Sequence, residues 1–77
     1  MAKRNIIGDR VKLARRKATP QITQKELAAR LQLCGLPIER VTVSKIETGY
    51  REVTDVEIAA IAKSLGTTIG WLFSEDR

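Results

Sequence analysis

The sequence predicts an all-α domain built from five short helices. Apolar residues recur at helical spacing along most of the chain, and two Thr-x-x-Glu segments have the spacing of helix capping boxes. No segment shows convincing strand alternation or a hairpin turn. At 77 residues the chain is expected to form one small domain over residues 1–77, with its core within about residues 5–73.

A proline and a capping box bound the first two helices. Apolar residues at positions 7, 11 and 14 predict a first helix over about residues 5–18, which Pro20 ends. In the segment from Thr23 to Glu26, the hydroxyl can accept from the Glu amide while the carboxylate reaches back to the Thr amide. A second helix is therefore expected to begin sharply at Thr23 and to end near Leu33. Its inward face carries Leu27, Ala28 and Leu31.

Glycine and proline interrupt the pattern before a third helix. Gly35 and Pro37 break the periodicity, so this helix is expected to begin near Pro37 or Glu39 and to end before Gly49. Val43 and Ile46 are expected to face inward.

A second capping box predicts the fourth helix. It runs from Thr54 to Glu57, and Gly66 is the expected stop of the helix that follows. Thr68 is then expected to cap a last short helix over residues 69–73.

Positive charge is concentrated at the front of the chain. Residues 1–17 hold seven Lys and Arg against one acid, residues 18–51 hold five against three, and residues 52–77 hold two against five. The formal net charge is +5. A basic front and an acidic back indicate a polyanionic partner on one side of the molecule.

Composition excludes several classes of site. The chain has no His and one Cys, which removes internal disulfides, Ser-His and Cys-His nucleophile pairs, and the usual zinc motifs. Cys34 is expected to be a buried small hydrophobe and not a redox site. The chain also lacks a Gly-rich phosphate loop, so neither catalysis nor a metal or other cofactor is expected. With no apolar run of about 20 residues and no signal-peptide core, a soluble cytoplasmic protein is expected.

Five short motifs occur in an order that is typical of one family. They are Ile7-Gly8, Ala14-Arg15, Thr23-Gln24-Lys25-Glu26-Leu27-Ala28, Ser44-Lys45-Ile46-Glu47-Thr48-Gly49 and Ile61-Ala62-Lys63-Ser64-Leu65-Gly66. Together they resemble the phage repressor and Cro (Xre-type) helix-turn-helix family, from Ile7 to Phe73. The resemblance implies a compact five-helix bundle of the lambda-repressor-like DNA-binding type, with helices 2 and 3 as the helix-turn-helix. One departure is a connection between these two helices that is about five residues longer than the usual tight turn.

The resemblance also implies a function and its residues. The chain is expected to be a sequence-specific regulator of transcription, acting as a repressor on double-stranded DNA in a prokaryotic cell or a phage-infected host, with helix 3 in the major groove. Expected base contacts are Arg40, Val41, Ser44 and Lys45, and expected phosphate contacts are Thr23, Gln24, Thr48, Tyr50 and Arg51. Alternatively, the basic face of helix 3 is merely solvated and Tyr50 packs its ring at the surface. Glu47 is expected to pair with Arg15, or else with Arg16, and so to tether helix 3 to the bundle.

Two further alternatives concern partners. Trp71, Leu72 and Phe73 are expected either to form a homodimer contact or, in the case of Leu72 and one aromatic residue, to finish the core. The same bundle can also serve as an antitoxin or as an adaptor-type protein-interaction module. No membrane and no small-molecule ligand is expected as a partner.

Overall fold

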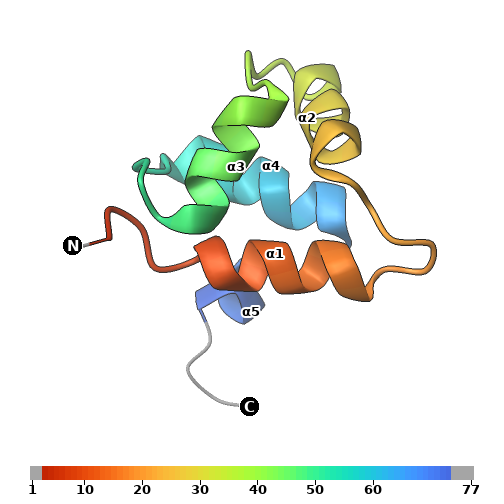
Figure 1. Ribbon diagram of the computed structural model, residues 1–77, viewed down its shortest axis with the longest axis horizontal. Coiled ribbons are helices and arrows are strands. Elements are labelled where there is room, and N and C mark those ends of the chain that lie inside the picture. Colours follow the sequence, from red (N-terminus) through yellow and green to blue (C-terminus); the bar gives the residue numbers. More distant parts are fainter. Residues whose placement is uncertain (1–2, 74–77) are drawn as a thin grey trace.

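The computed structural model describes residues 3–73 and contains five α-helices (Figure 1). They are α1 (Gly8–Lys17), α2 (Gln24–Leu33), α3 (Arg40–Thr48), α4 (Asp55–Leu65) and α5 (Ile69–Phe73). No residue in this range is assigned to a strand. The predicted all-α, five-helix fold is therefore confirmed. No helix within residues 3–73 is long and apolar enough to span a membrane.

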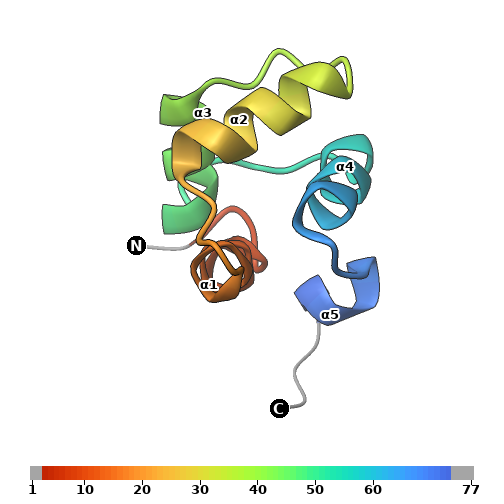
Figure 2. The same cartoon turned by 90° about the vertical axis from the view of Figure 1, so that its right-hand side faces the viewer.

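The helices enclose a single apolar core. Helix α3 packs against α1 and α2, while α4 closes the other side against α2, α1 and α5 (Figure 2). The buried apolar side chains are Ile7, Val11, Ile22, Leu27, Ala28, Leu31, Ile38, Val43, Ile46, Ile61, Ala62 and Leu72. Each helix thus contributes at least one buried residue to the core. Helix α3 is held in place by its contacts with α1 and α2.

Both predicted capping boxes are present. At the start of α2, Glu26 N donates to Thr23 Oγ1 at 3.0 Å and Thr23 N donates to Glu26 Oε1 at 2.8 Å. At the start of α4, Thr54 and Glu57 exchange the same two bonds at 3.2 and 3.0 Å. Each box satisfies a backbone amide that has no partner within the helix. The predicted starts of α2 and α4 are therefore confirmed.

Helix α1 is shorter than the predicted range of about 5–18. Its first amides are taken by the side chain of Asn5, whose Oδ1 accepts from Ile7 N at 3.1 Å and Gly8 N at 2.8 Å. At the other end, Ala18 is extended, with ψ of 149°. The helix therefore begins only at Gly8 and ends at Lys17.

The long α2–α3 connection is anchored to the core through Ile38, with Leu36 also packed against it, whereas the last residue of α2 before it is exposed. Ile38 is buried in the core, and Gln32 Nε2 donates to its carbonyl oxygen at 2.8 Å. Leu33, by contrast, is 89% exposed. Helix α3 then begins at Arg40 with Glu39 as its N-cap, the second of the two predicted starts.

The expected burial of Cys34 is wrong. The residue is exposed, although it lies three positions after the buried Leu31. Helix α2 ends at Leu33, and Gly35 takes a positive φ of 88°, which turns the chain away from the core. Because the helix ends before Cys34, helical spacing does not predict whether this residue is buried.

Candidate nucleic-acid interface

Helix α3 presents one buried and one exposed face. Val43, Ile46 and Glu47 are buried against the bundle. The predicted base-contact residues lie on the other side: Arg40, Val41 and Lys45 are exposed, and Ser44 is half-buried. Val41 is 51% exposed, which leaves its methyl groups accessible to a ligand. The exposed face combines hydrogen-bond donors with one apolar group, as contact with base edges requires.

Three helices are joined beneath this face by a buried polar cluster. Arg15 of α1 binds Glu47 of α3 through two contacts, Nε to Oε2 at 2.7 Å and Nη2 to Oε1 at 2.9 Å. Arg15 also donates to Ile22 O at 3.0 Å, and Gln24 Nε2 of α2 donates to Glu47 Oε1 at 3.0 Å. The hydrogen bond that Arg15 donates to Glu47 raises the pKa of Arg15, despite the opposing effect of burial. The predicted partner Arg15 thus makes this pair, whereas Arg16 is exposed.

The predicted phosphate contacts on α2 have structural partners of their own. The Thr23 oxygen accepts a backbone amide in the capping box, but its hydroxyl hydrogen remains free to donate. Gln24 lies in the first turn of α2 and is half-buried, with one amide hydrogen bond directed at Glu47. A phosphate at this helix terminus would share Gln24 with Glu47.

A basic hollow of about 470 Å³ lies where the start of α2 faces α1 and α3. We call it the α2 hollow. Its cationic side chains come from all three helices, and together they are Lys12, Arg15, Arg16, Lys25 and Arg40. Thr23 and Gln24 line it as well. The hollow therefore places two predicted phosphate contacts and one predicted base contact among several cations.

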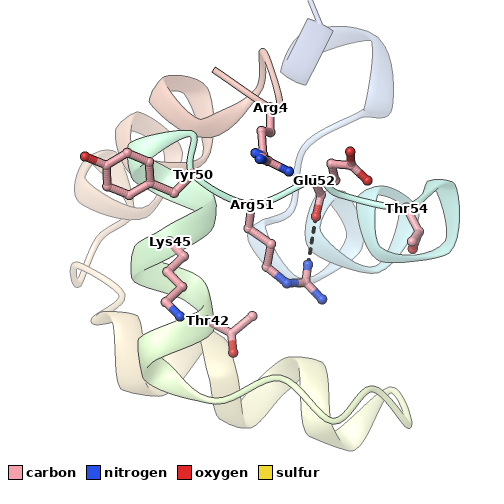
Figure 3. Close-up of a pocket in the computed structure, with 7 residues that line it drawn as sticks. All are labelled: Arg4, Thr42, Lys45, Tyr50, Arg51, Glu52 and Thr54. Carbon is pink, nitrogen blue, oxygen red and sulfur yellow. Dashed lines mark hydrogen bonds between the residues drawn. The ribbon is translucent and has the colours of Figure 1, made fainter. Parts of the chain in front are cut away.

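A second hollow, of about 580 Å³, lies beside the C-terminal half of α3. We call it the α3–α4 hollow, and Figure 3 shows its lining. The lining residues are Arg4, Thr42, Lys45, Tyr50, Arg51, Glu52 and Thr54. Lys45, Tyr50 and Arg51 are among the expected DNA contacts, whereas Thr42 is not. Arg4 was not identified as a site residue, because it precedes the first family motif.

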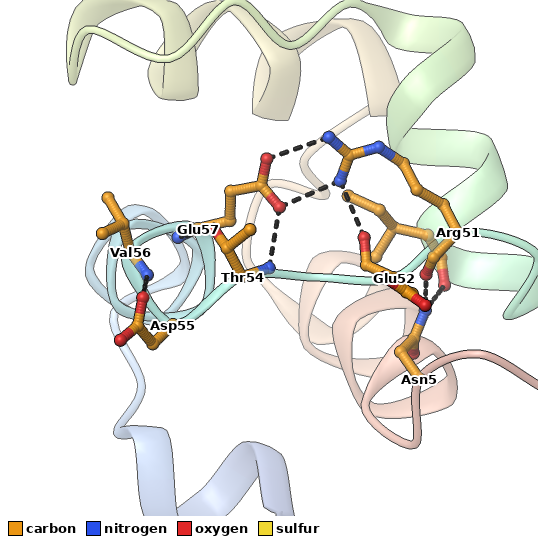
Figure 4. Close-up of polar contacts among 8 residues, drawn as sticks. Asn5, Arg51, Glu52, Thr54, Asp55, Val56 and Glu57 are labelled. Carbon is orange, nitrogen blue, oxygen red and sulfur yellow. Dashed lines mark hydrogen bonds and ion pairs between the residues drawn. The ribbon is translucent and has the colours of Figure 1, made fainter.

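Arg51 is occupied by an intramolecular ion pair. Its Nη1 and Nη2 donate to the two carboxylate oxygens of Glu57, each at 2.9 Å, and Nη1 also donates to Glu52 O at 3.0 Å (Figure 4). The hydrogen bonds that Arg51 donates to Glu57 lower the pKa of Glu57 and raise the pKa of Arg51. Arg51 therefore holds the α3–α4 connection to the start of α4. Sequence reasoning assigned Glu57 to its capping box alone and missed this pair.

Thr48 and Tyr50, the other two expected phosphate contacts near the end of α3, differ in how free their hydroxyl groups are to bind a phosphate. Thr48 Oγ1 is placed to donate to Ser44 O at 3.1 Å or Lys45 O at 3.2 Å, so binding a phosphate through its hydroxyl would break a bond inside α3. Tyr50 is 59% exposed and its hydroxyl points away from Arg4 and Arg51 (Figure 3). Tyr50 is thus accessible at the edge of the α3–α4 hollow.

The three C-terminal apolar residues have different environments. Leu72 is 1% exposed and belongs to the chain's own core, which leaves Trp71 and Phe73 for any contact with a second copy. Trp71 is half-buried, with the Arg10 guanidinium 4.0 Å from its ring centroid, and Arg10 Nε donates to Trp71 O at 3.1 Å. Phe73 is 39% exposed.

Comparison with known proteins supports the family suggested by the motifs. A family model described as helix-turn-helix matches residues 13–72. No curated protein matches the chain significantly. No solved structure does so either.

Proposed function

From the premise that the chain belongs to the Xre and lambda-repressor-like helix-turn-helix family of DNA-binding regulators, we propose that it is a sequence-specific transcriptional repressor that inserts α3 into the major groove. It acts by occupying its operator and performs no chemistry itself. The observation that carries the proposal is the exposed face of α3, which lies between two hollows that both contain cationic side chains.

In this proposal the two hollows bind phosphates and position the protein, while the exposed face of α3 contacts the bases and determines specificity. Phosphates positioned by the α2 hollow and the α3–α4 hollow would hold the two ends of α3 against the groove, since backbone contacts fix register. Arg40 and Lys45 are then the candidates for guanine O6 and N7, Val41 for a thymine methyl, and Ser44 for a base or a phosphate. Because Glu47 is buried and paired with Arg15, it adds little repulsion towards DNA.

The direct test is selection of bound sequences from a random duplex pool at near-physiological salt. The proposal expects a two-fold-symmetric motif with half-sites about one helical turn apart. Recovery of unenriched DNA, bound with a steep salt dependence, would contradict sequence-specific recognition. That result would favour the alternative of an antitoxin or adaptor module, for which the exposed Leu33 at the end of α2 offers an apolar contact.

A pair of variants separates base contacts from phosphate contacts. Lys45→Ala is expected to relax selection at one base position, with a loss of about 1–3 kcal/mol in discrimination if the contact is bidentate. Tyr50→Phe removes only a hydroxyl and is expected to weaken all sequences alike. Binding titrations on the selected duplex and on single-base variants of it measure both effects. Unchanged preference in the Lys45 variant would remove Lys45 from the base contacts.

A further inference from the structure

We propose that Arg4 is a DNA-backbone contact, and that the segment from Lys3 to Asn5 extends the interface beyond the helix-turn-helix itself. The inference rests on the proposed function and adds a binding residue to it. Arg4 lies outside residues 13–72, which the family model matches. Its assignment therefore comes from the structure of this chain.

Asn5 fixes this segment across the end of α3. Its Nδ2 donates to Ile46 O at 3.1 Å and to Arg51 O at 2.7 Å (Figure 4). Its Oδ1 accepts from the amides of Ile7 and Gly8 at the start of α1. The neighbouring Arg4 N donates to Gly49 O at 2.8 Å. The backbone at Arg4 and Asn5 is thus hydrogen-bonded to the C-terminal part of α3 and to the residues just after it. These hydrogen bonds fix the position of the Arg4 backbone beside the α3–α4 hollow.

Arg4 makes no ion pair among residues 3–73, unlike its neighbours Lys3 and Arg51. Lys3 Nζ lies 3.4 Å from Asp9, and Arg51 is paired with Glu57. Among residues 3–73, neither Arg4 nor Lys45 makes an ion pair. These two side chains therefore supply the cationic character of the α3–α4 hollow, and both are exposed. An anion bound there would release counterions without breaking an existing pair.

The arrangement fits a run of phosphates better than a single free anion. Figure 3 shows Arg4 and Lys45 lining the hollow from different elements, Arg4 from the segment before α1 and Lys45 from α3, with the Arg51 side chain turned toward α4. Two cations carried by separate elements can each bind a different phosphate of one DNA strand, which spaces its charges along the backbone. The Glu52 carboxylate, the one acidic group of the lining, points away from Lys45.

The test compares Arg4→Gln with Lys63→Gln, using the full chain and the selected duplex. Both variants remove one positive charge, but Lys63 lies on α4 and lines neither hollow. Arg4→Gln is expected to reduce the slope of log K against log salt by about 0.9, so that the wild type loses about 3.5-fold more affinity than the variant between 50 and 200 mM salt. Lys63→Gln is expected to retain the wild-type slope. Thermal unfolding of Arg4→Gln should match the wild type, because its side chain makes no ion pair within residues 3–73.

Methylphosphonate scanning of the same duplex locates the contact. Neutralising one phosphate at the Arg4 position should weaken the wild type but leave the Arg4→Gln variant unaffected. Equal salt slopes for Arg4→Gln and Lys63→Gln, with specific wild-type binding intact, would overturn the Arg4 assignment alone. Failure of the wild type to bind any duplex would overturn the proposed function and the Arg4 contact together. Saturable binding of inorganic phosphate that Arg4→Gln abolishes would identify a free-anion site and would also overturn the assignment.

Discussion

Glu47 is a carboxylate on a helix whose other face is cationic, and its partners explain its presence. With its side chain 2% exposed, it receives two bonds from Arg15 and one from Gln24. Removing one member of a buried ion pair leaves the other charge without compensation, which is more costly than exchanging both for apolar groups. The side chain therefore contributes to orientation of α3 as well as to stability.

Glu47→Gln tests this role. The variant keeps the shape of the side chain but leaves the Arg15 guanidinium buried without a counter-charge, so we expect a loss of about 3 kcal/mol in the free energy of unfolding. Urea unfolding at neutral pH measures it. Glu39→Gln, an exposed carboxylate just before α3 that makes no capping bond, is the matched control and should change stability by less than about 0.5 kcal/mol. Equal stability of the two variants would show that the pair does not tether α3.

Glu57 predicts a pH dependence of stability. Its pKa is lowered chiefly by the hydrogen bond from Arg51, and a carboxylate whose folded-state pKa lies below its unfolded value stabilises the fold above the unfolded pKa. This contribution is present at neutral pH and is lost as the pH falls below the ordinary value of 4.5 through the folded-state pKa. The stability difference between wild type and Glu57→Gln should therefore shrink in urea unfolding as the pH is lowered from neutral to values below 4.5.

Arg51→Gln supplies the control for that measurement. Without the guanidinium, the main cause of the lowered pKa is gone, so a second Glu57→Gln substitution should produce a smaller difference with weaker pH dependence. A pH dependence of the same size in both backgrounds would assign the effect to the capping box and not to Arg51.

The contact between α1 and α3 depends on a glycine. A Cβ added at Gly8 would collide with the carbonyl oxygen of Ile46 and would lie 2.8 Å from that of Glu47, both of which are backbone atoms. Helix α1 crosses α3 at this point, so the added methyl group can be accommodated only if the two helices separate. The close approach of the α3 backbone to Gly8 thus explains why a glycine occupies this position of the first family motif.

Gly8→Ala and Gly70→Ala should consequently change stability in opposite directions. We expect Gly8→Ala to lower the free energy of unfolding by about 1–3 kcal/mol through overpacking. In α5, the nearest atom to a Cβ at position 70 is Thr68 Oγ1 at 3.9 Å, so the change should stabilise by up to about 1 kcal/mol through helix propensity. Thermal or urea unfolding compares them, and equal effects of one sign would refute the close-approach explanation.

Local signals predicted the elements, and long-range contacts account for what was missed. The starts of α2 and α4 followed from bonds between residues three apart, and the family motifs indicated Arg15 as the partner of Glu47. Asn5 was missed because its bonds to Ile46 and Arg51 span 41 and 46 residues, which no periodic pattern reveals. Ile38 was missed because it lies in a connection, where helical spacing does not predict burial. The site residues on α3 remain predictions until DNA binding is measured.

At the scale of the whole molecule, contacts with the rest of the bundle hold both ends of α3 and leave one face exposed. Buried apolar side chains and the Arg15–Glu47–Gln24 cluster hold α3 to α1 and α2, while Asn5 and the Arg51–Glu57 pair hold its C-terminal end. A ligand on α3 is therefore bound by the bundle as a unit. The remaining apolar surface near the C-terminus lies on a different element, where a second copy could bind without covering α3.

A homodimer through α5 is the last prediction, with Phe73 and the accessible part of Trp71 as its contacts. Leu72 is excluded from this surface by its burial, and one face of Trp71 is already covered by Arg10. Because an isologous contact pairs identical patches, one substitution removes the side chain from both sides of the interface. Phe73→Ser should therefore weaken dimer formation in sedimentation equilibrium and abolish the advantage of a two-half-site duplex over a single half-site.

Val56→Ser is the control, since Val56 is an exposed apolar residue of α4, 62% accessible, and its loss removes apolar surface outside α5. Circular dichroism of both variants shows whether the monomer remains folded, so that lost affinity is not confused with unfolding. A folded Phe73→Ser protein that still prefers two half-sites as strongly as the wild type would place the dimer contact elsewhere. A wild type that stays monomeric on two-half-site DNA would remove the dimer altogether, and single half-sites would then have to provide the specificity of the operator.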